Sequence, residues 1–355
     1  MYRDTWVEVD LDRIYHNVKV IKEYTGYDML YAVVKANGYG HGDIEVAEVA
    51  LEAGATHLAV AFLDEAIRLR EHFDVPILVL GYTSKEYFDI ASELNISLTI
   101  TEAIYYDKPL NVHLKIDTGM NRLGLSTVEE IQNLLEIINK SPNLNLEGVF
   151  THLATAGSND EYYFKQLSRF KEVMPKNTFI HVNNSAGMLA YKEKYNAGRL
   201  GIAMYGLAPY EGELPVELRQ AFSLNSTITR VHKITKGEAV GYGASFVASK
   251  DSYIGTVPIG YADGFLRYHK GREVSINGKR YKIVGNICMD QLMVLVDETV
   301  KQHDIVELIN DDITVDELAS DLNTINYEIV CSISDRVPRI YKRNNKVVKI
   351  NNYRY

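Results

Sequence analysis

The sequence has few cysteines, no long apolar run and no block of like charge. Two cysteines in 355 residues, Cys288 and Cys331, cannot form a disulfide framework and suit free thiols in a reducing cytoplasm. No CxxC or HExxH spacing indicates a metal site. No apolar stretch is long enough to span a bilayer, and the first residues lack the apolar segment of a signal peptide. We therefore expect a cytoplasmic protein without a bound metal.

The charge balance excludes another class of partner. The net charge is -9 and the charged residues are interspersed, which argues against binding to nucleic acid or to an anionic membrane. A hydrophobic content of 46% over 355 residues is enough for two domains, each with its own core.

Strand-like runs alternate with helix-like runs over the first two-thirds of the chain. Two helical patterns are clear, because Asp43 to Ala53 and Val128 to Ile138 each gather apolar residues largely on one face. Eight strands alternating with helices predict an α/β fold, a (β/α)8 TIM-type barrel, over residues 1–219. The predicted strands span residues 29–36, 57–61, 76–81, 96–101, 111–117, 146–153, 178–185 and 197–202.

One connection in this pattern is unusually short. Only nine residues, 102–110, join the fourth and fifth predicted strands. A parallel crossover usually needs about a dozen residues or more. Either the helix there is a stub, or one strand boundary lies elsewhere.

From about residue 220 the pattern changes, and we predict a mostly-β domain over residues 220–355. Val274 to Val284 is typical of a hairpin with a type I′ turn at Asn277-Gly278. The segment Trp6 to Val9 lies outside the barrel count, and we expect it to pair with this domain. Further strand-like runs are Thr227 to Val231, Val294 to Val296 and Ile305 to Ile309.

A single lysine follows the first predicted barrel strand. Lys35 comes directly after the apolar run from Met29 to Val34 and precedes three glycines in five residues. Partial desolvation at the end of a buried strand makes a lysine amine a nucleophile, as a Schiff-base lysine requires. A lone strand-end lysine more often extends to solvent, but the glycines allow a ligand to approach the backbone closely.

Other polar residues fall at the ends of later strands. Chemistry in such barrels is carried at the carboxyl ends of the strands, so polar groups converging there predict a site at the barrel mouth. Taken singly, His152 could be a core histidine, Arg122 a solvated charge and Asn184-Ser185 a helix cap. The converging residues are Lys35, Asp117, Arg122, His152, Asn184, Ser185, Arg199 and Gly201.

The eleven residues from Ala32 to Gly42, AVVKANGYGHG, resemble the attachment motif for pyridoxal 5'-phosphate (PLP) in alanine racemases, and the resemblance extends from Trp6 to Arg339. It implies that Lys35 binds PLP through an imine bond and that the Tyr39 hydroxyl contacts the cofactor phosphate. It places His152 and Asn184 in the cofactor site.

The resemblance also assigns the later barrel loops. Loops after the seventh and eighth strands often bind phosphate in this fold, and in the family the positions of Ser185, Gly201 and Ile202 hold the PLP phosphate. The family places an arginine, here Arg199, against the pyridine nitrogen. Because a guanidinium cannot accept a proton, the nitrogen stays neutral. We hypothesise that such a site favours return of the proton over transamination.

Inverting a stereocentre requires a second group on the face opposite Lys35. Tyr242, in the string VGYGA, matches the second base of the family, which the partner subunit supplies; alone it could be a turn aromatic. A phenol is a weak base at neutral pH, so charge from Arg199 relayed through His152 would favour the phenolate.

Three more strings of the β domain match the family. In GNICMDQ the Met289 amide would bind the substrate carboxylate together with Arg122, although Met289 could be an ordinary core residue. In IGYADGF the entrance tyrosine would be Tyr261. In TINYEI, Tyr327 would reach the phosphate and favours alanine over serine as substrate.

The resemblance thus implies a PLP-dependent alanine racemase that interconverts L- and D-alanine for peptidoglycan, as a homodimer with shared active sites. A racemase of serine or of broader specificity is an alternative. A decarboxylase of the same architecture normally has an acidic residue at the pyridine nitrogen, so Arg199 argues against it. A non-catalytic PLP carrier or regulatory protein is usually a single barrel, so the β domain argues against that. Lys115, whose counterpart is carbamylated in some relatives, stays unassigned.

Overall fold

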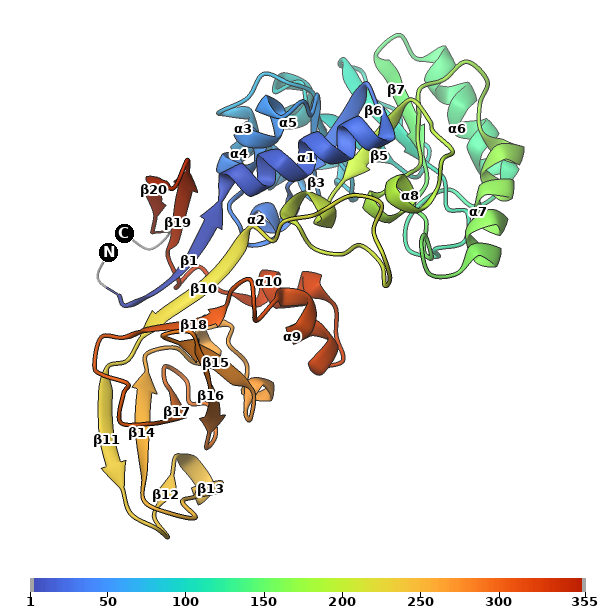
Figure 1. The fold of residues 1–355 in the computed structure, drawn as a ribbon. Coiled ribbons are helices and arrows are strands. Elements are labelled where there is room, and N and C mark those ends of the chain that lie inside the picture. The colour runs from blue at the N-terminus through green and yellow to red at the C-terminus, as the bar shows by residue number, and fades with distance from the viewer. Residues whose placement is uncertain (1–2, 353–355) are drawn as a thin grey trace. The chain divides into compact units, whose positions relative to one another are not determined.

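The computed structural model describes residues 3–352, and the chain divides into two compact units (Figure 1). One unit is Ile14–Arg219, and the other combines Met1–Arg13 with Gln220–Tyr355. Within residues 3–352, no helix is both long enough and apolar enough to cross a membrane.

The unit Ile14–Arg219 is a barrel of eight parallel strands, which confirms the predicted fold class. The strand order is β8-β7-β6-β5-β4-β3-β2-β9, and backbone bonds from Asn196 N to Ile180 O and from Arg199 N to Asn183 O, both 2.9 Å, join its two ends. The strands are β2 (Met29–Val33), β3 (His57–Val60), β4 (Ile77–Val79), β5 (Ser97–Ile100), β6 (Leu110–Lys115), β7 (Leu144–Phe150), β8 (Ile180–His181) and β9 (Ala197–Leu200).

Helices follow most of the barrel strands. Helix α7 begins after the cap Asn159, whose side chain accepts a hydrogen bond from Tyr162 N. In α6, Ile131, Leu134 and Ile138 are buried at the predicted spacing, and the cap Thr127 exchanges bonds with Glu130. The helices are α1 (Leu11–Thr25), α2 (Lys35–Tyr39), α3 (Asp43–Glu52), α4 (Leu63–Arg70), η1 (Lys85–Tyr87), α5 (Phe88–Glu93), α6 (Val128–Lys140), α7 (Asp160–Val173), α8 (Ser185–Ala190) and η2 (Ile202–Tyr205).

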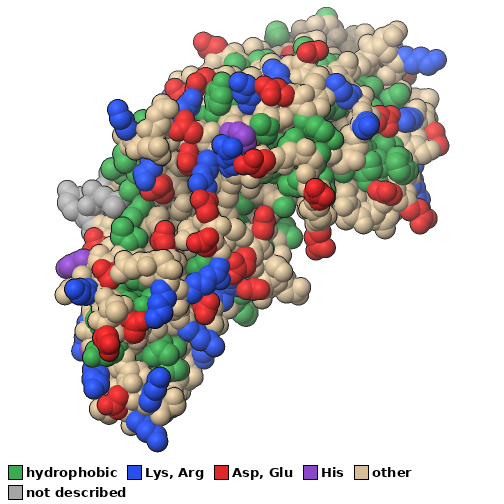
Figure 2. Space-filling model, in the orientation of Figure 1, with side chains coloured by type: hydrophobic (Ala, Val, Ile, Leu, Met, Phe, Trp, Pro, Cys, Tyr) green, Lys and Arg blue, Asp and Glu red, His purple; other side chains and the backbone are tan. Residues whose placement is uncertain are grey.

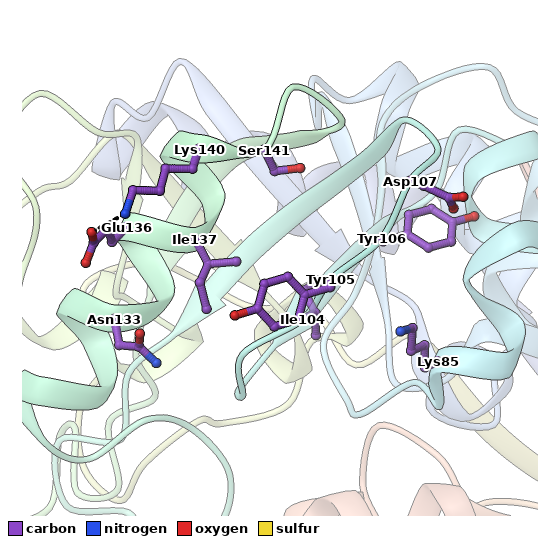
Figure 3. A pocket seen from close by; sticks show the side chains of 10 residues that line it. All are labelled: Lys85, Ile104, Tyr105, Tyr106, Asp107, Asn133, Glu136, Ile137, Lys140 and Ser141. Atoms are coloured by element: carbon purple, nitrogen blue, oxygen red, sulfur yellow. Dashed lines mark hydrogen bonds and ion pairs between the residues drawn. The ribbon is translucent and has the colours of Figure 1, made fainter.

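The short crossover contains no helix at all. Residues 101–109 run irregularly from β5 to β6, and both strand boundaries lie within one residue of the predicted ones. A groove of about 830 Å³ lies beside this crossover (Figure 3). Tyr105 and Tyr106 line one side, and Ile137 and Lys140 of α6 line the other. None of the predicted site residues lines this groove, so we do not assign the site to it.

The second unit is mostly β, as predicted. Its ten-stranded sheet has the order β11-β14-β17-β16-β15-β18-β10-β1-β19-β20, and a separate hairpin joins β12 and β13. The first strand β1 pairs with β10 and β19, which confirms that the N-terminal segment joins this sheet. Its elements are β1 (Thr5–Asp10), β10 (Phe222–Thr227), β11 (Arg230–Ile234), β12 (Ala239–Val240), η3 (Tyr242–Ala244), β13 (Phe246–Val247), β14 (Ser252–Val257), η4 (Tyr261–Asp263), η5 (Arg267–His269), β15 (Glu273–Ile276), β16 (Lys279–Val284), β17 (Leu292–Val296), β18 (Ile305–Ile309), α9 (Val315–Asp321), α10 (Asn326–Ser332), β19 (Arg339–Arg343) and β20 (Lys346–Asn351).

One strand prediction for this unit is confirmed and another is wrong. Asn277 and Gly278 have φ of 52° and 75°, the conformation that a type I′ hairpin requires, and they join β15 to β16 as predicted. The predicted strand at 227–231 is wrong. Ile228 leaves the ladder because its N–H and C=O bond to Asp304 O and His303 N, so β10 ends before β11 begins.

The surface carries no single-sign region on the face that Figure 2 shows. Acidic and basic side chains alternate there over both parts of the chain. In the described residues, no group of three or more histidines, cysteines or carboxylates is placed to hold a metal ion.

Candidate active site

Lys35 begins a strained left-handed turn. It lies two residues beyond β2, and the four residues from Ala36 to Tyr39 all have φ between 52° and 58°. A left-handed conformation costs an L-residue about 1–2 kcal/mol, so a run of this kind persists only where the surroundings enforce it, typically at functional sites. Glu65 contributes to this, because its Oε1 accepts from Ala36 N at 2.6 Å. The predicted strand 29–36 was therefore too long.

Tyr39, Ser185 and Gly201 form a small polar cradle. Ser185 Oγ accepts from Gly201 N at 2.8 Å. A Cβ atom at position 201 would lie 2.9 Å from the Tyr39 hydroxyl oxygen and 3.7 Å from Ser185 Oγ, so glycine leaves the cradle open. Ile202 begins η2 directly after it. The structure thus brings together four residues that we predicted to hold a phosphate.

Asn184 is the cap of the neighbouring helix α8. Its Oδ1 accepts from Gly187 N at 2.9 Å. Asn184 therefore caps a helix, which is one of the two interpretations of this residue, and its contact with a cofactor stays a prediction.

Arg199 lies inside the barrel with only 3% of its surface exposed. Its Nη1 donates to His181 Nδ1 at 3.0 Å and to His181 O at 2.5 Å, and its Nη2 donates to Thr151 O and Val182 O. Its Nε donates to no residue between 3 and 352. Burial lowers the pKa of Arg199 to about 10, which leaves it charged at neutral pH. One N–H donor of a buried cation therefore stays available to a ligand.

Cations surround His152. Burial first, and then the charges of Arg199, Arg122, Lys115 and Lys35, hold the pKa of His152 well below its usual value. His152 is therefore neutral at pH 7. Within the described chain, no hydrogen bond joins it to Arg199, so any influence of Arg199 on this ring acts through space.

Asp117 shapes the loop that presents Arg122. Its carboxylate accepts from the backbone N–H groups of Gly119, Asn121 and Arg122 at 2.9, 3.1 and 3.1 Å. Asn121 has φ of 55°, a conformation that asparagine tolerates better than most residues. Arg122 itself is exposed.

Loops of the second unit gather the remaining predicted residues. Tyr261 N donates to Cys288 O at 3.1 Å, and the neighbouring Ala262 N donates to Met289 O at 3.0 Å. A Cβ atom at position 260 would lie 2.2 Å from Cys288 O, so only glycine permits this approach. Tyr261 and Met289 are both solvent-exposed, at 39% and 53%.

The segments that carry Tyr242 and Tyr327 are bonded to the loops of Met289 and Tyr261, respectively. Tyr242 lies between Gly241 and Gly243 at the tip of the β12–β13 hairpin, and its side chain is 75% exposed. Its carbonyl accepts from Asn286 Nδ2 at 2.8 Å, three residues before Met289. Tyr327 lies in α10, and burial raises its pKa to about 12. Ser332, at the end of that helix, donates to Gly264 O at 3.3 Å.

Three barrel residues near Arg199 were missed by the sequence analysis: His113, His181 and Glu147. His181 contacts Arg199 directly, and His113 contacts His181. The available signal was the position of His113 two residues before Lys115 in one strand, which places both on the same face.

Comparison with known proteins identifies the family. A model described as the alanine racemase N-terminal domain matches residues 9–209, and one for the alanine racemase C-terminal domain matches residues 221–341. The chain belongs to the alanine racemase family. Alanine racemase 1 of Bacillus subtilis is 49% identical to it, over 99% of this chain and 96% of that protein.

Solved structures agree with this assignment. The alanine racemase from Bacillus anthracis with bound L-Ala-P superposes with a TM-score of 0.94 at 42% identity, covering 99% of this chain and 98% of that one. The histidine racemase from Leuconostoc mesenteroides has a TM-score of 0.89 at 31% identity, covering 96% and 99%. The expectation of an isomerase from this family is confirmed.

Proposed function

We propose that this protein is a PLP-dependent racemase that interconverts L-alanine and D-alanine. The observation that carries the proposal is the setting of Lys35. Its Nζ lies 6.0 Å from the centre of the Tyr39 ring, and the hydroxyl of that ring forms the polar cradle with Ser185 and Gly201. The full-length match to alanine racemases supports alanine as substrate and disfavours the decarboxylase and the regulatory protein.

The barrel residues fit PLP on three counts. The cradle offers two hydroxyls and an unobstructed backbone to a phosphate, and a Cβ at position 201 would fill it. Lys35 offers an amine for an imine bond. Arg199 Nε offers a donor to a neutral ring nitrogen. His152 and Asn184 would complete the surroundings of the cofactor. When bound, PLP withdraws electrons from the α-carbon of an amino acid and so acidifies its α-proton.

Two bases would move the proton. Lys35 would remove the α-proton on one face and Tyr242 would return one on the other, with the roles exchanged for the opposite enantiomer. The exposure of Tyr242, 75%, suits a group that acts outside its own unit. His152, whose ring is neutral, would act on Tyr242 as a hydrogen-bonding partner rather than as a further charge.

The substrate carboxylate would bind to Arg122 and to the Met289 amide. The carboxylate of Asp117 fixes the backbone of the Arg122 loop, which holds the guanidinium close to one position before substrate arrives. Tyr261 would border the entrance and Tyr327 would reach the phosphate. The loops that carry Tyr261 and Met289 are bonded to each other, which supports their action in one site.

We further propose a cytoplasmic homodimer in which each site combines Lys35 of one subunit with Tyr242 of its partner, supplying D-alanine for peptidoglycan. The test mixes two inactive variants, Lys35→Ala and Tyr242→Phe. Random exchange of subunits makes half of the dimers mixed, and each mixed dimer has one intact site out of two. About a quarter of the wild-type activity should therefore return. Each variant alone is the control. If the mixture stays inactive although the subunits exchange, the shared site is wrong.

A further inference from the structure

Two buried histidines of the barrel have no part in the reaction as proposed so far. His113 of β6 and His181 of β8 are 2% and 0% exposed, and His113 Nδ1 lies 2.9 Å from His181 Nε2. The interior of such a barrel is usually filled by branched apolar side chains. These imidazoles instead lie against Phe150, whose ring stacks on His181 at 4.7 Å, and near Tyr31, whose ring is 5.2 Å from His181.

The pair connects Arg199 to one carboxylate. At one end, Arg199 Nη1 lies 3.0 Å from His181 Nδ1. At the other, His113 Nε2 lies 3.6 Å from Glu147 Oε2, slightly beyond hydrogen-bond length. The same carboxylate accepts from Ser97 Oγ at 2.5 Å. No carboxylate of the described chain forms an ion pair with Arg199, so Glu147 is the acidic group that this chain of contacts reaches.

The backbone is adapted to these contacts. In the β6–β7 ladder Val112 pairs with Leu146, but His113 pairs with Gly148, so Glu147 is the extra residue of a β-bulge. Bulges of this kind redirect a side chain. A Cβ atom at position 148 would lie 2.6 Å from His113 Nδ1, so the glycine makes room for the imidazole.

Hydrogen-bond chemistry gives the chain of contacts one direction. A guanidinium N–H can only donate, so His181 Nδ1 must accept from Arg199. Burial, and then the charge of Arg199, keep the pKa of His181 well below its usual value, so the ring is neutral and carries its proton on Nε2. That proton is donated to His113 Nδ1. Burial also lowers the pKa of His113, whose proton is therefore on Nε2, toward Glu147.

We propose that His181, His113 and Glu147 form a one-directional relay that positions Arg199, with Glu147 as the distant counter-charge. The acceptor His181 Nδ1 and three backbone carbonyls hold Nη1 and Nη2, so the relay supplies the one side-chain contact among the four that orient the Nε–H donor. The effect on catalysis rests on the proposed function, because Arg199 acts there on the cofactor ring. The protonated nitrogens of His113 and His181 do not depend on the proposed function.

The first test is nuclear magnetic resonance of the holoenzyme with ¹⁵N-labelled histidine. Long-range proton–nitrogen correlations should show His113 and His181 as neutral rings protonated on Nε2, unchanged between pH 7 and pH 9. A ring protonated on Nδ1, or one that titrates in this range, would overturn the relay. This outcome is readable even if the protein proves not to racemise alanine.

The second test compares Glu147→Gln with His57→Gln. His57 is the control, since its Nδ1 contacts Thr56 Oγ1 at 2.8 Å and, among the described residues, no hydrogen bond joins it to His113, His181 or Glu147. Glu147→Gln keeps an oxygen acceptor and removes the charge. We expect kcat to fall roughly tenfold with KM for alanine unchanged, a loss typical of a group that orients a site residue, together with a shift of the His113 Nε2 resonance. Equal kinetics for Glu147→Gln and His57→Gln, or a kcat loss without any change at His113, would refute the proposal.

Discussion

Replacing Gly201 by alanine tests the polar cradle directly. The added Cβ would lie 2.9 Å from the Tyr39 hydroxyl oxygen, closer than carbon and oxygen normally approach, and 3.7 Å from Ser185 Oγ. The hydroxyl cannot move away freely, because Tyr39 is only 5% exposed and its ring packs against Tyr205 at 4.9 Å between centroids. The methyl group would therefore enter the space assigned to the phosphate.

Overpacking of this kind costs about 1–3 kcal/mol. Because one contact is short and the other is ordinary, we expect about 1–2 kcal/mol, which weakens PLP binding roughly 5- to 30-fold. Equilibrium dialysis of the cofactor-free protein against PLP measures the dissociation constant. Gly212→Ala is the control, since Gly212 has φ of 109° but no atom within 4 Å of an added Cβ. Unchanged binding by Gly201→Ala, or an equal loss in Gly212→Ala, would refute the assignment of the cradle.

Three further predictions follow from the barrel. Asp117→Asn leaves fewer hydrogen-bond acceptors for the backbone of the Arg122 loop. In steady-state assays, KM for alanine should therefore rise roughly fivefold while kcat changes less. An unchanged KM would contradict the role of Asp117 in holding this loop. Burial lowers the pKa of Lys115 from 10.5 to about 8, so its charge destabilises the fold below pH 8 and the penalty fades as pH rises to 10.5. Lys115→Met should therefore raise the free energy of unfolding, measured with urea, by about 1–3 kcal/mol at pH 7 and by less at pH 10. Equal gains at the two pH values would contradict this prediction. Ala36→Gly relieves a left-handed φ of 54°, so the free energy of unfolding should stay unchanged or rise by up to about 1 kcal/mol. The control Ala50→Gly in α3 should lower the free energy of unfolding by about 1 kcal/mol. Equal losses in the two variants would contradict the strain at Ala36.

The parts of the fold that local sequence determines were predictable. The alternation of strands and helices predicted the barrel, and Asn277-Gly278 predicted a hairpin turn that the structure confirms. The positions of Ser185 and Gly201 at the ends of two strands also indicated that these residues would meet, as they do. These signals depend on residues near one another in sequence, so they are readable without the fold.

Features that depend on distant partners were not predictable. The left-handed turn after Lys35 depends partly on Glu65, thirty residues away, and nothing in the string AVVKANGYGHG shows it. The bulge at Glu147 depends on pairing with β6. The absence of any helix between β5 and β6 could be suspected from length alone, but the outcome required the structure.

Tyr242 illustrates a different limit. Its exposure and the bonds of its hairpin follow from its own unit, but the action on a substrate that we propose for it would require a second subunit, which the mixing experiment tests.

The most direct test of the account is to incubate the purified protein, loaded with PLP, with each of several L-amino acids and to separate the enantiomers by chiral chromatography. We expect L-alanine to convert to an equal mixture of L- and D-alanine faster than L-serine or L-histidine is converted. Absence of any D-enantiomer would contradict the proposed racemase, and faster conversion of another amino acid would contradict alanine as its substrate.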